Sequence, residues 1–536
     1  MIGWDYNIHM MTPAFYSRNA ALIDDPSVNL LFEDAMAMSD KEFSDWAWNL
    51  RKLIVKLWDQ GIPPRNGLDE QGIIDQFDRM TIHPVHEFLL EDLLTGEKNV
   101  IRNETNLGNA ANQWFPSMLA TRIAYTSKLN DAKSVYDWFA DDSLHERFMK
   151  YVRRHYQRDG FYHYSMPVRR NNAKDFLFHT ESGEEWVKWF EANRRHYLED
   201  DYWLAPKCLN KAYTGAAEDE EIHHQLFIPK EHIADLPIPE TSKYNMGNPD
   251  DCDGYQIRYY KLGQRIFPLG LKTFRVSFCQ YAVNYPPLTA RYLYERYTEH
   301  IKDQDVINIY DPSMGWGGRI LGAMAVKDDR NIHYIGTDPN TDHNLPDGTT
   351  KYANLADFYN TRTNRANSLF PHTHTYDIFQ RGSEVIGDDE RFQKYRGKLD
   401  MVFTSPPYFA KEIYSEDPEQ SAHKFTTYKT WRDGFLRPTL TTAVEYLKSD
   451  RYLLWNIANC VFDNINLPLE DDSRAILEEL GMEYVETLKM TLSTMPGGNR
   501  VDEEGKPRTE SFVRIRKVGG GEMYRKYEPI FVYRKP

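Results

Sequence analysis

The sequence predicts an α/β protein with a doubly wound, mostly parallel sheet in its C-terminal half and a mostly helical N-terminal region. From about residue 270 onward, strand-like apolar runs alternate with helix-like segments, which is the rhythm of a parallel sheet covered by helices. Before that point the chain is rich in Trp, Tyr, Arg and His, and its apolar residues recur at helical spacing. We therefore expect two domains, 1–270 and 271–536.

Composition restricts the class of protein. A chain of 536 residues with 41% hydrophobic and 14% aromatic residues is globular and long enough for more than one core. It has no apolar run of membrane-spanning length and no signal peptide pattern, so we expect a cytoplasmic protein that does not associate with membranes. The four cysteines are scattered without a CxxC pair, which predicts neither a metal site nor a disulfide framework. A net charge of −15 argues against general coating of nucleic acid but leaves room for a local basic groove.

The elements of the N-terminal region are expected to be helices. Residues 42–61 have apolar side chains at helical spacing and end on a glycine, which favours helix termination. Residues 131–160 show the same spacing and predict one or two further helices.

The elements of the C-terminal half follow in a regular order. We expect strands in the segments DVINIY (305–310), NIHYIGTDPN (331–340) and KLDMVF (398–403), a helix followed by a strand within 430–459, and a closing strand in YEPIFVYRK (527–535). Because parallel strands end at one edge of the sheet, ligands are expected at that edge.

The first candidate motif is the turn DPSMGWGGR (311–319), which follows the first of these strands. Gly315, Gly317 and Gly318 allow the backbone to approach a ligand closely. No Gly-Lys-Ser/Thr follows, so the turn is not a P-loop. Asp311 is unsuited to a pyrophosphate and suits a cofactor with a cationic amino-acid group; the alternative is a plain glycine-rich turn.

The second candidate is Asp338, at the end of the next strand. An acid in this place can accept hydrogen bonds from both ribose hydroxyls of a cofactor. The alternative is that it caps the following turn.

The third candidate is the turn Ser405-Pro406-Pro407-Tyr408, after the strand at 398–403. Prolines fix φ and lack N–H groups, so the turn is stiff. The Ser405 hydroxyl and the Pro406 carbonyl are candidate acceptors for an exocyclic NH2, and Tyr408 offers a flat face to a base. The alternative is a stiff loop with a packed tyrosine.

In this order, the glycine turn, Asp338 and the segment TSPPYF (404–409) resemble the amino-group DNA methyltransferases, which methylate N4 of cytosine or N6 of adenine. The segment YPPLTARYLYERY (285–297) is similar to the part of that family which completes the pocket for the methionine moiety of the cofactor. The resemblance covers about half of the chain. It departs from the family's usual pattern at Trp316, where a small residue is common, and at Ser405, where Asp or Asn is common, so the target base stays open.

The resemblance implies S-adenosyl-L-methionine as cofactor and a Rossmann-like methyltransferase domain. It implies cofactor contacts by Asp311, Pro312, Ser313, Gly315, Gly317 and Asp338, and it makes Phe278, Tyr281 and Ser383 further candidates for the cofactor pocket. It implies catalytic roles for Ser405, Pro406, Pro407 and Tyr408 on a base that has been flipped out of double-stranded DNA. No Pro-Cys pair occurs in the chain, so methylation at cytosine C5 through a cysteine nucleophile is not expected.

Basic residues interleaved with aromatics predict where DNA binds, although such runs are more often solvated helix faces. One run lies between 150 and 174, a second begins at 258, and the loop after TSPPYF adds a lysine; the candidates are Arg153, Arg154, Arg158, Arg169, Arg170, Lys174, Arg258 and Lys411. The expected function is DNA methylation in a restriction–modification system or in the protection of phage or mobile-element DNA. An RNA-directed enzyme and a catalytically silent nucleic-acid-binding protein are the alternatives.

Overall fold

The structure is a computed structural model. It describes residues 38–59, 70–102, 107–108, 111–123, 132–149, 282–327, 331–362, 374–492, 511–516 and 521–536, the single residues 30, 34 and 68, and three strands between 162 and 259. The chain divides into two compact units, one formed by residues 1–19, 55–137 and 279–536 and the other by 20–54 and 138–278. The boundary that we predicted near residue 270 lies outside the described residues and stays a prediction. Residues 55–137 group with the C-terminal half.

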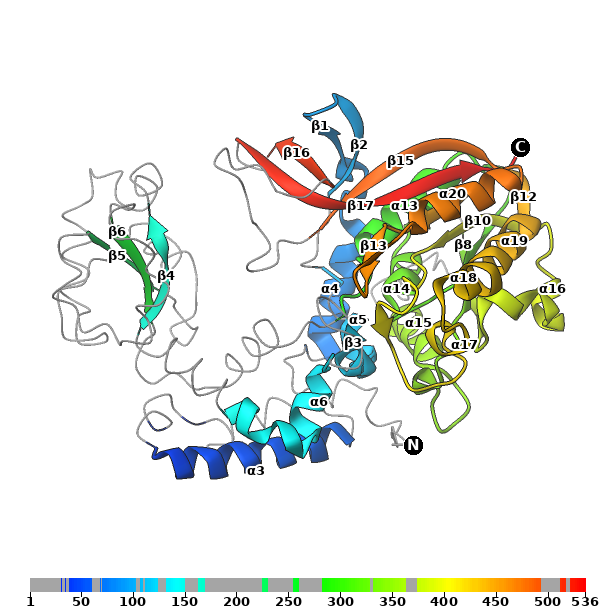
Figure 1. Ribbon diagram of the computed structural model, residues 1–536. Helices are drawn as coiled ribbons and strands as arrows, with labels where there is room; N and C mark the ends of the chain where they lie inside the picture. The colour runs from blue at the N-terminus through cyan, green and yellow to red at the C-terminus, as the bar shows by residue number, and fades with distance from the viewer. Residues whose placement is uncertain are drawn as a thin grey trace. The chain divides into compact units, whose positions relative to one another are not determined.

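The larger unit contains a mixed sheet, and ten of its strands lie in the described part of the chain (Figure 1). Along the sheet the strands are β1 (Leu89–Asp92), β2 (Glu97–Ile101), β15 (Glu483–Thr491), β17 (Glu522–Arg534), β12 (Leu447–Asn456), β10 (Leu399–Thr404), β7 (Val306–Asp311), β8 (Asn331–Thr337) and β9 (Thr375–Phe379), and β16 (Phe512–Arg516) also pairs with β17. The five strands from β12 to β9 are parallel, whereas β17 is antiparallel to β12 and β15. The predicted α/β class is confirmed.

Helices cover both faces of this sheet. One face packs against α13 (Pro287–Thr298), α14 (Gly318–Met324) and α15 (Lys351–Arg362), and the other against α16 (Glu390–Gln393), α18 (Tyr428–Trp431), α19 (Arg437–Tyr446) and α20 (Leu469–Glu479). In β10 all six residues are buried, with Met401 and Phe403 in the first core and Val402 in the second. Burial on both sides explains why this strand is a continuous apolar run in the sequence.

Segments from the N-terminal region complete the same unit, which we did not predict. Strand β2 adds to the sheet by pairing in parallel with β15, and α4 (Glu70–Ile82), η2 (Val85–Phe88), α5 (Ala111–Trp114) and η3 (Pro116–Ala120) lie close by in sequence. The ring of Phe77 in α4 stacks on that of Tyr359 in α15, with centroids 4.3 Å apart. The described part of the N-terminal region is therefore partly helical, and it supplies part of the core of the larger unit.

The smaller unit contains most of α3 (Asp40–Asp59), which confirms the helix predicted at 42–61. Phe43, Ala47, Leu50 and Ile54 recur at helical spacing and are buried. The smaller unit also contains a three-stranded antiparallel sheet in the order β4 (Tyr162–Val168), β6 (Gly254–Tyr259), β5 (His224–Pro229). Among the described residues of the whole chain, no helix combines the length and the apolar character that a membrane crossing requires.

Candidate active site

The three predicted motifs lie at the same edge of the sheet. Strands β7, β8 and β10 are parallel neighbours. Strand β7 ends at Asp311, the first residue of the glycine turn, whereas β8 and β10 end immediately before Asp338 and Ser405. Two hydrogen bonds join the motifs. Thr404 Oγ1 donates to Asp311 Oδ1 at 2.7 Å, and the backbone N–H of Gly315 donates to Asp338 Oδ2 at 3.0 Å. Segments up to 93 residues apart in sequence thus form one site.

Asp311 is fully buried, and protein groups surround its carboxylate. It forms an ion pair with Arg319 Nε at 2.7 Å and also accepts hydrogen bonds from the hydroxyl of Tyr334 and the backbone N–H of Ser313. Burial is the largest single effect on the pKa of Arg319 and lowers it, but the charge and hydrogen bond of Asp311, together with Tyr334 and Tyr294, raise that pKa above its ordinary value. With the bond from Thr404, these donors occupy the lone pairs of the carboxylate. Direct contact of Asp311 with a cofactor stays a prediction.

The glycine turn is closely packed on one side. Gly317 has φ of +75°, and a Cβ added there would lie 2.4 Å from the ring of Phe115. A Cβ on Gly318 would lie 2.1 Å from the carbonyl oxygen of Tyr285. Gly315, with φ of +62°, has no neighbour closer than 3.8 Å to such a Cβ. The backbone is therefore open at Gly315, where a ligand can approach it.

Two other residues of the turn that we expected at the cofactor use their carbonyls within the protein. The carbonyl of Pro312 accepts a hydrogen bond from Thr337 Oγ1 at 2.7 Å, and that of Ser313 accepts one from Arg319. Their contact with a cofactor is not tested by these bonds.

Asp338 is half-buried beside the open glycine. Its Oδ1 accepts the backbone N–H of Asn340 at 2.9 Å, and Tyr352 donates to Oδ2, together with Gly315. Burial raises the pKa of Asp338 to about 6, against the effect of these hydrogen bonds. The carboxylate is thus mostly ionised at neutral pH, and Oδ1 retains a lone pair for a further donor. This arrangement fits a ligand that carries hydroxyl groups, such as a ribose.

The Ser405–Tyr408 turn is anchored by the residue that follows it. Phe409 has φ of +56°, which is unfavourable for a residue with a bulky side chain. Its ring is 5% exposed and packs against the rings of Phe462 and Trp431, at centroid distances of 5.4 and 6.1 Å. Burial of this ring offsets the backbone strain and holds the turn in place.

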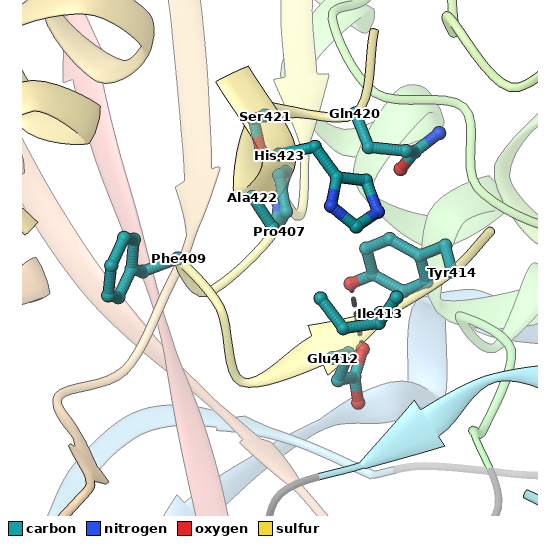
Figure 2. Close-up of a pocket in the computed structure, with 9 residues that line it drawn as sticks. All are labelled: Pro407, Phe409, Glu412, Ile413, Tyr414, Gln420, Ser421, Ala422 and His423. Atoms are coloured by element: carbon teal, nitrogen blue, oxygen red, sulfur yellow. Dashed lines mark hydrogen bonds between the residues drawn. The ribbon is translucent and has the colours of Figure 1, made fainter. Parts of the chain in front are cut away.

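A hollow beside the turn is shown in Figure 2. Phe409 points away from Glu412, Tyr414 and His423, which lie together on the other side, and Tyr414 donates a hydrogen bond to Glu412 at 2.7 Å. The lining residues are Pro407, Phe409, Glu412, Ile413, Tyr414, Gln420, Ser421, Ala422 and His423.

Sequence reasoning missed one acidic residue at this edge. Glu528 lies in β17, and burial together with the charge of Glu412 raises its pKa to about 7. It interacts with the hydroxyl of Tyr408. That hydroxyl is buried and has no hydrogen bond of good geometry among the described residues. The signal in the sequence was an acid within the otherwise apolar strand YEPIFVY.

The remaining predicted residues are distributed as follows. Ser383 is buried at the start of η10 (Ser383–Asp388), and its hydroxyl is 2.9 Å from that of Thr439. Lys411 Nζ donates to the carbonyl of Val461 at 3.0 Å. Arg258 lies on β6, but its side chain is outside the described residues. Also outside them are Phe278, Tyr281, Arg153, Arg154, Arg158, Arg169, Arg170 and Lys174. Within the described ranges, no group of His, Cys, Asp and Glu is arranged to hold a metal ion.

Solved structures with a limited similarity to this chain include methyltransferases. One is an S-adenosylmethionine-dependent methyltransferase from Methanosarcina mazei, 11% identical, with a TM-score of 0.24, matched over 47% of this chain and 99% of its own. A candidate class I methyltransferase from Listeria monocytogenes is 13% identical, with a TM-score of 0.27, matched over 50% and 67%. A candidate DNA modification methylase from Thermus thermophilus is 17% identical, with a TM-score of 0.18, matched over 29% and 51%.

No family model matches the sequence, and no curated protein matches it.

Proposed function

We propose that this chain is a DNA methyltransferase that transfers a methyl group from S-adenosylmethionine to an exocyclic base amine, N4 of cytosine or N6 of adenine. The observation that carries the proposal is the hydrogen-bonded junction of the three motifs, in which Asp311 binds Thr404 and Asp338 binds Gly315. The junction brings the expected cofactor side and the expected acceptor side of the reaction to one edge of the sheet. A restriction–modification system, or protection of phage or mobile-element DNA, is the setting that we infer.

On the cofactor side, the backbone at Gly315 and the carboxylate of Asp338 are the proposed contacts, with Ser383, Phe278 and Tyr281 as further candidates. When bound, S-adenosylmethionine supplies a methyl group on a positively charged sulfur. Asp338 would orient the ribose through its hydroxyls, and the open glycine would allow close approach of the backbone. The buried Asp311 carboxylate would hold both motifs in place by accepting hydrogen bonds from Ser313, Arg319 and Thr404.

On the acceptor side, the hydroxyl of Ser405 and the carbonyl of Pro406 would accept the two N–H groups of the amine. Such acceptors direct the nitrogen lone pair towards the methyl group, so catalysis depends on position and electrostatics rather than on a covalent intermediate. The ring of Tyr408 would stack on the flipped base. DNA phosphates would be bound by the predicted basic residues, among them Arg153, Arg258 and Lys411.

The test is mass spectrometry of nucleosides from varied double-stranded DNA incubated with the protein and S-adenosylmethionine. We expect N4-methylcytosine or N6-methyladenine with the unsubstituted protein and a large loss with Ser405→Ala. Ser449→Ala is the matched control, because Ser449 is exposed at the beginning of β12, near the opposite edge of the sheet.

Other results would favour the alternatives. Methylation of RNA but not of DNA would favour the RNA-directed enzyme. Absence of both transfer and cofactor binding would favour the silent nucleic-acid-binding protein.

A further inference from the structure

Ser405 creates a chemical requirement that an aspartate would not. When an amine is methylated, its nitrogen gains a positive charge and must then lose a proton. A carboxylate in this position can accept and keep that proton. A serine hydroxyl can accept a hydrogen bond from the amine, but it is far too weak a base to hold the proton. A proton acceptor is therefore needed beyond Ser405.

Glu528 is a carboxylate placed to meet this requirement. Strand β17 is antiparallel to β12, and its Ile530 pairs with Asn456, the last residue of β12. Glu528 precedes Ile530 by two residues, so it lies beyond the end of β12, at the edge where Ser405 follows β10. Residues two apart in a strand share a face, so Glu528 is on the side of Ile530, which faces the core shared with α13 and α14.

Two buried hydroxyls surround this carboxylate without completed hydrogen bonds. Ser405 and Glu528 both act on the pKa of the Tyr408 hydroxyl, so both lie near it. Tyr285, which is 9% exposed, has a second such hydroxyl, and Glu528 acts on it as well. Neither hydroxyl has a hydrogen-bond partner among the described residues. Leaving buried polar groups unsatisfied is costly, which indicates that a further polar group, such as that of a ligand, completes the cluster.

We propose that Ser405, Tyr408 and Glu528 form a relay that removes the proton which the target amine loses on methylation. This inference rests on the proposed function. The nitrogen lone pair forms the bond to the methyl carbon, and the carbon–sulfur bond breaks with its electrons going to sulfur. The N–H proton then passes to Ser405 Oγ, the hydroxyl proton of Ser405 to Tyr408 Oη, and that of Tyr408 to Glu528. Glu528 becomes a neutral acid and later releases the proton to water.

The surroundings of Glu528 suit this task. The charged and titratable groups that act on its pKa are Glu412 from β11 (Glu412–Ile413), Lys526 from β17 itself and Tyr408. Glu528 in turn acts on the pKa of Tyr285. Burial and then Glu412 raise its pKa to about 7, while Lys526 and Tyr408 oppose the rise. A proton acceptor near neutrality both takes up and releases protons readily at physiological pH.

The first test is the pH dependence of methyl transfer in a single turnover. For the unsubstituted protein, the rate should fall about tenfold per pH unit well below pH 7 because Glu528 becomes protonated. With S-adenosylmethionine saturating at every pH, so that protonation of Asp338 near pH 6 does not limit binding, Glu528→Gln should be slower by a factor on the order of 100 and lack this acid limb. Glu412→Gln should move the limb to lower pH, because it removes the charge that raises the pKa of Glu528.

If the three residues form one relay, the rate losses caused by substituting them should not add. Tyr408→Phe keeps the aromatic ring and removes the hydroxyl, so it should lose as much rate as Glu528→Gln. The double variant should lose no more than either single variant. Tyr484→Phe is the matched control, since Tyr484 is exposed on β15 and its hydroxyl bonds only Thr487 among the described residues.

A second readout needs neither cofactor nor DNA. Glu528 has a raised pKa in the folded state, so its contribution to stability is fully present below its ordinary pKa of about 4.5 and is lost as the pH rises through about 7. Urea unfolding between pH 4.5 and 8 should show this decline in the unsubstituted protein and less of it in Glu528→Gln. The same curves show whether each variant folds.

The outcomes separate the relay from the proposed function. Transfer by all variants with one common pH profile, or additive losses in the double variant, would overturn the relay alone. Absence of transfer by the unsubstituted protein at every pH would overturn the proposed function and, with it, the relay.

Discussion

Replacing Asp311 by Asn tests whether this residue serves the structure or the cofactor. Asp311 and Arg319 are 0% and 4% exposed, and they form an ion pair at 2.7 Å. Asn keeps the shape but leaves the guanidinium of Arg319 buried without a counter-charge. Removing one partner of a buried pair typically costs about 3–5 kcal/mol. The new NH2 group also disturbs the bonds from Thr404 and Tyr334. We expect Asp311→Asn to lose about 3–5 kcal/mol of unfolding free energy.

The assay is urea unfolding at pH 7 followed by fluorescence, with Asp338→Asn as the matched control. Asp338 has no cation bound to it among the described residues, so its replacement should cost only about 1 kcal/mol, the net value of a hydrogen bond. Arg319→Met should restore part of the stability lost by Asp311→Asn, because it removes the unpaired charge. If Asp311→Asn cost less than about 1 kcal/mol yet abolished cofactor binding, the structural role would be refuted. The direct cofactor contact expected from the sequence would then be supported.

Three further predictions concern the two turns and Asp338. Calorimetry should show that S-adenosylmethionine binds the unsubstituted protein more weakly as the pH falls through about 6, because protonation of Asp338 removes an acceptor. Asp338→Asn should bind the cofactor weakly at every pH. An unchanged pH dependence of binding in the variant would contradict this role of Asp338. Gly317→Ala should lower the unfolding free energy measured in urea by about 2 kcal/mol or more, because alanine is strained at φ of +75° and its Cβ would lie 2.4 Å from Phe115. An unchanged unfolding free energy would mean that the turn relaxes. Phe409→Ala should lower the unfolding free energy by about 3–5 kcal/mol, because its ring leaves a cavity. Leu94→Ala is a control at an exposed position. A loss for Phe409→Ala no larger than that of this control would show that the ring does not anchor the turn.

The sequence was sufficient to predict the central strands and the edge at which the motifs meet. Strands buried on both faces leave long apolar runs, and the carboxyl ends of parallel neighbours must lie together. Strand β10 and its proline turn are the clearest case, because the run and the turn are contiguous in the chain.

What could not be predicted depends on partners distant in sequence. The pairing of β2 with β15 brings together residues 100 and 489, and β2 carries no local signal of which strand it will join. The four donors around Asp311 come from its own turn, α14, β8 and β10, so local sequence cannot show whether that carboxylate faces a ligand or the core. Glu528 was missed for the same reason, since its position at this edge depends on the register between β17 and β12.

The position of Asp311 couples the two sides of the proposed reaction. One buried carboxylate holds the beginning of the glycine turn through Ser313 and the end of β10 through Thr404, which directly precedes Ser405. A displacement of the glycine turn of even 1 Å would therefore strain the bond to Thr404 and shift Ser405 with it. Methyl transfer requires its donor and acceptor atoms to be held to within fractions of an ångström, because small misplacements cost large factors in rate. In the proposed reaction, a shared buried anchor would provide this precision without any contact to the reacting groups, so Asp311 would affect the rate of transfer while remaining enclosed in protein.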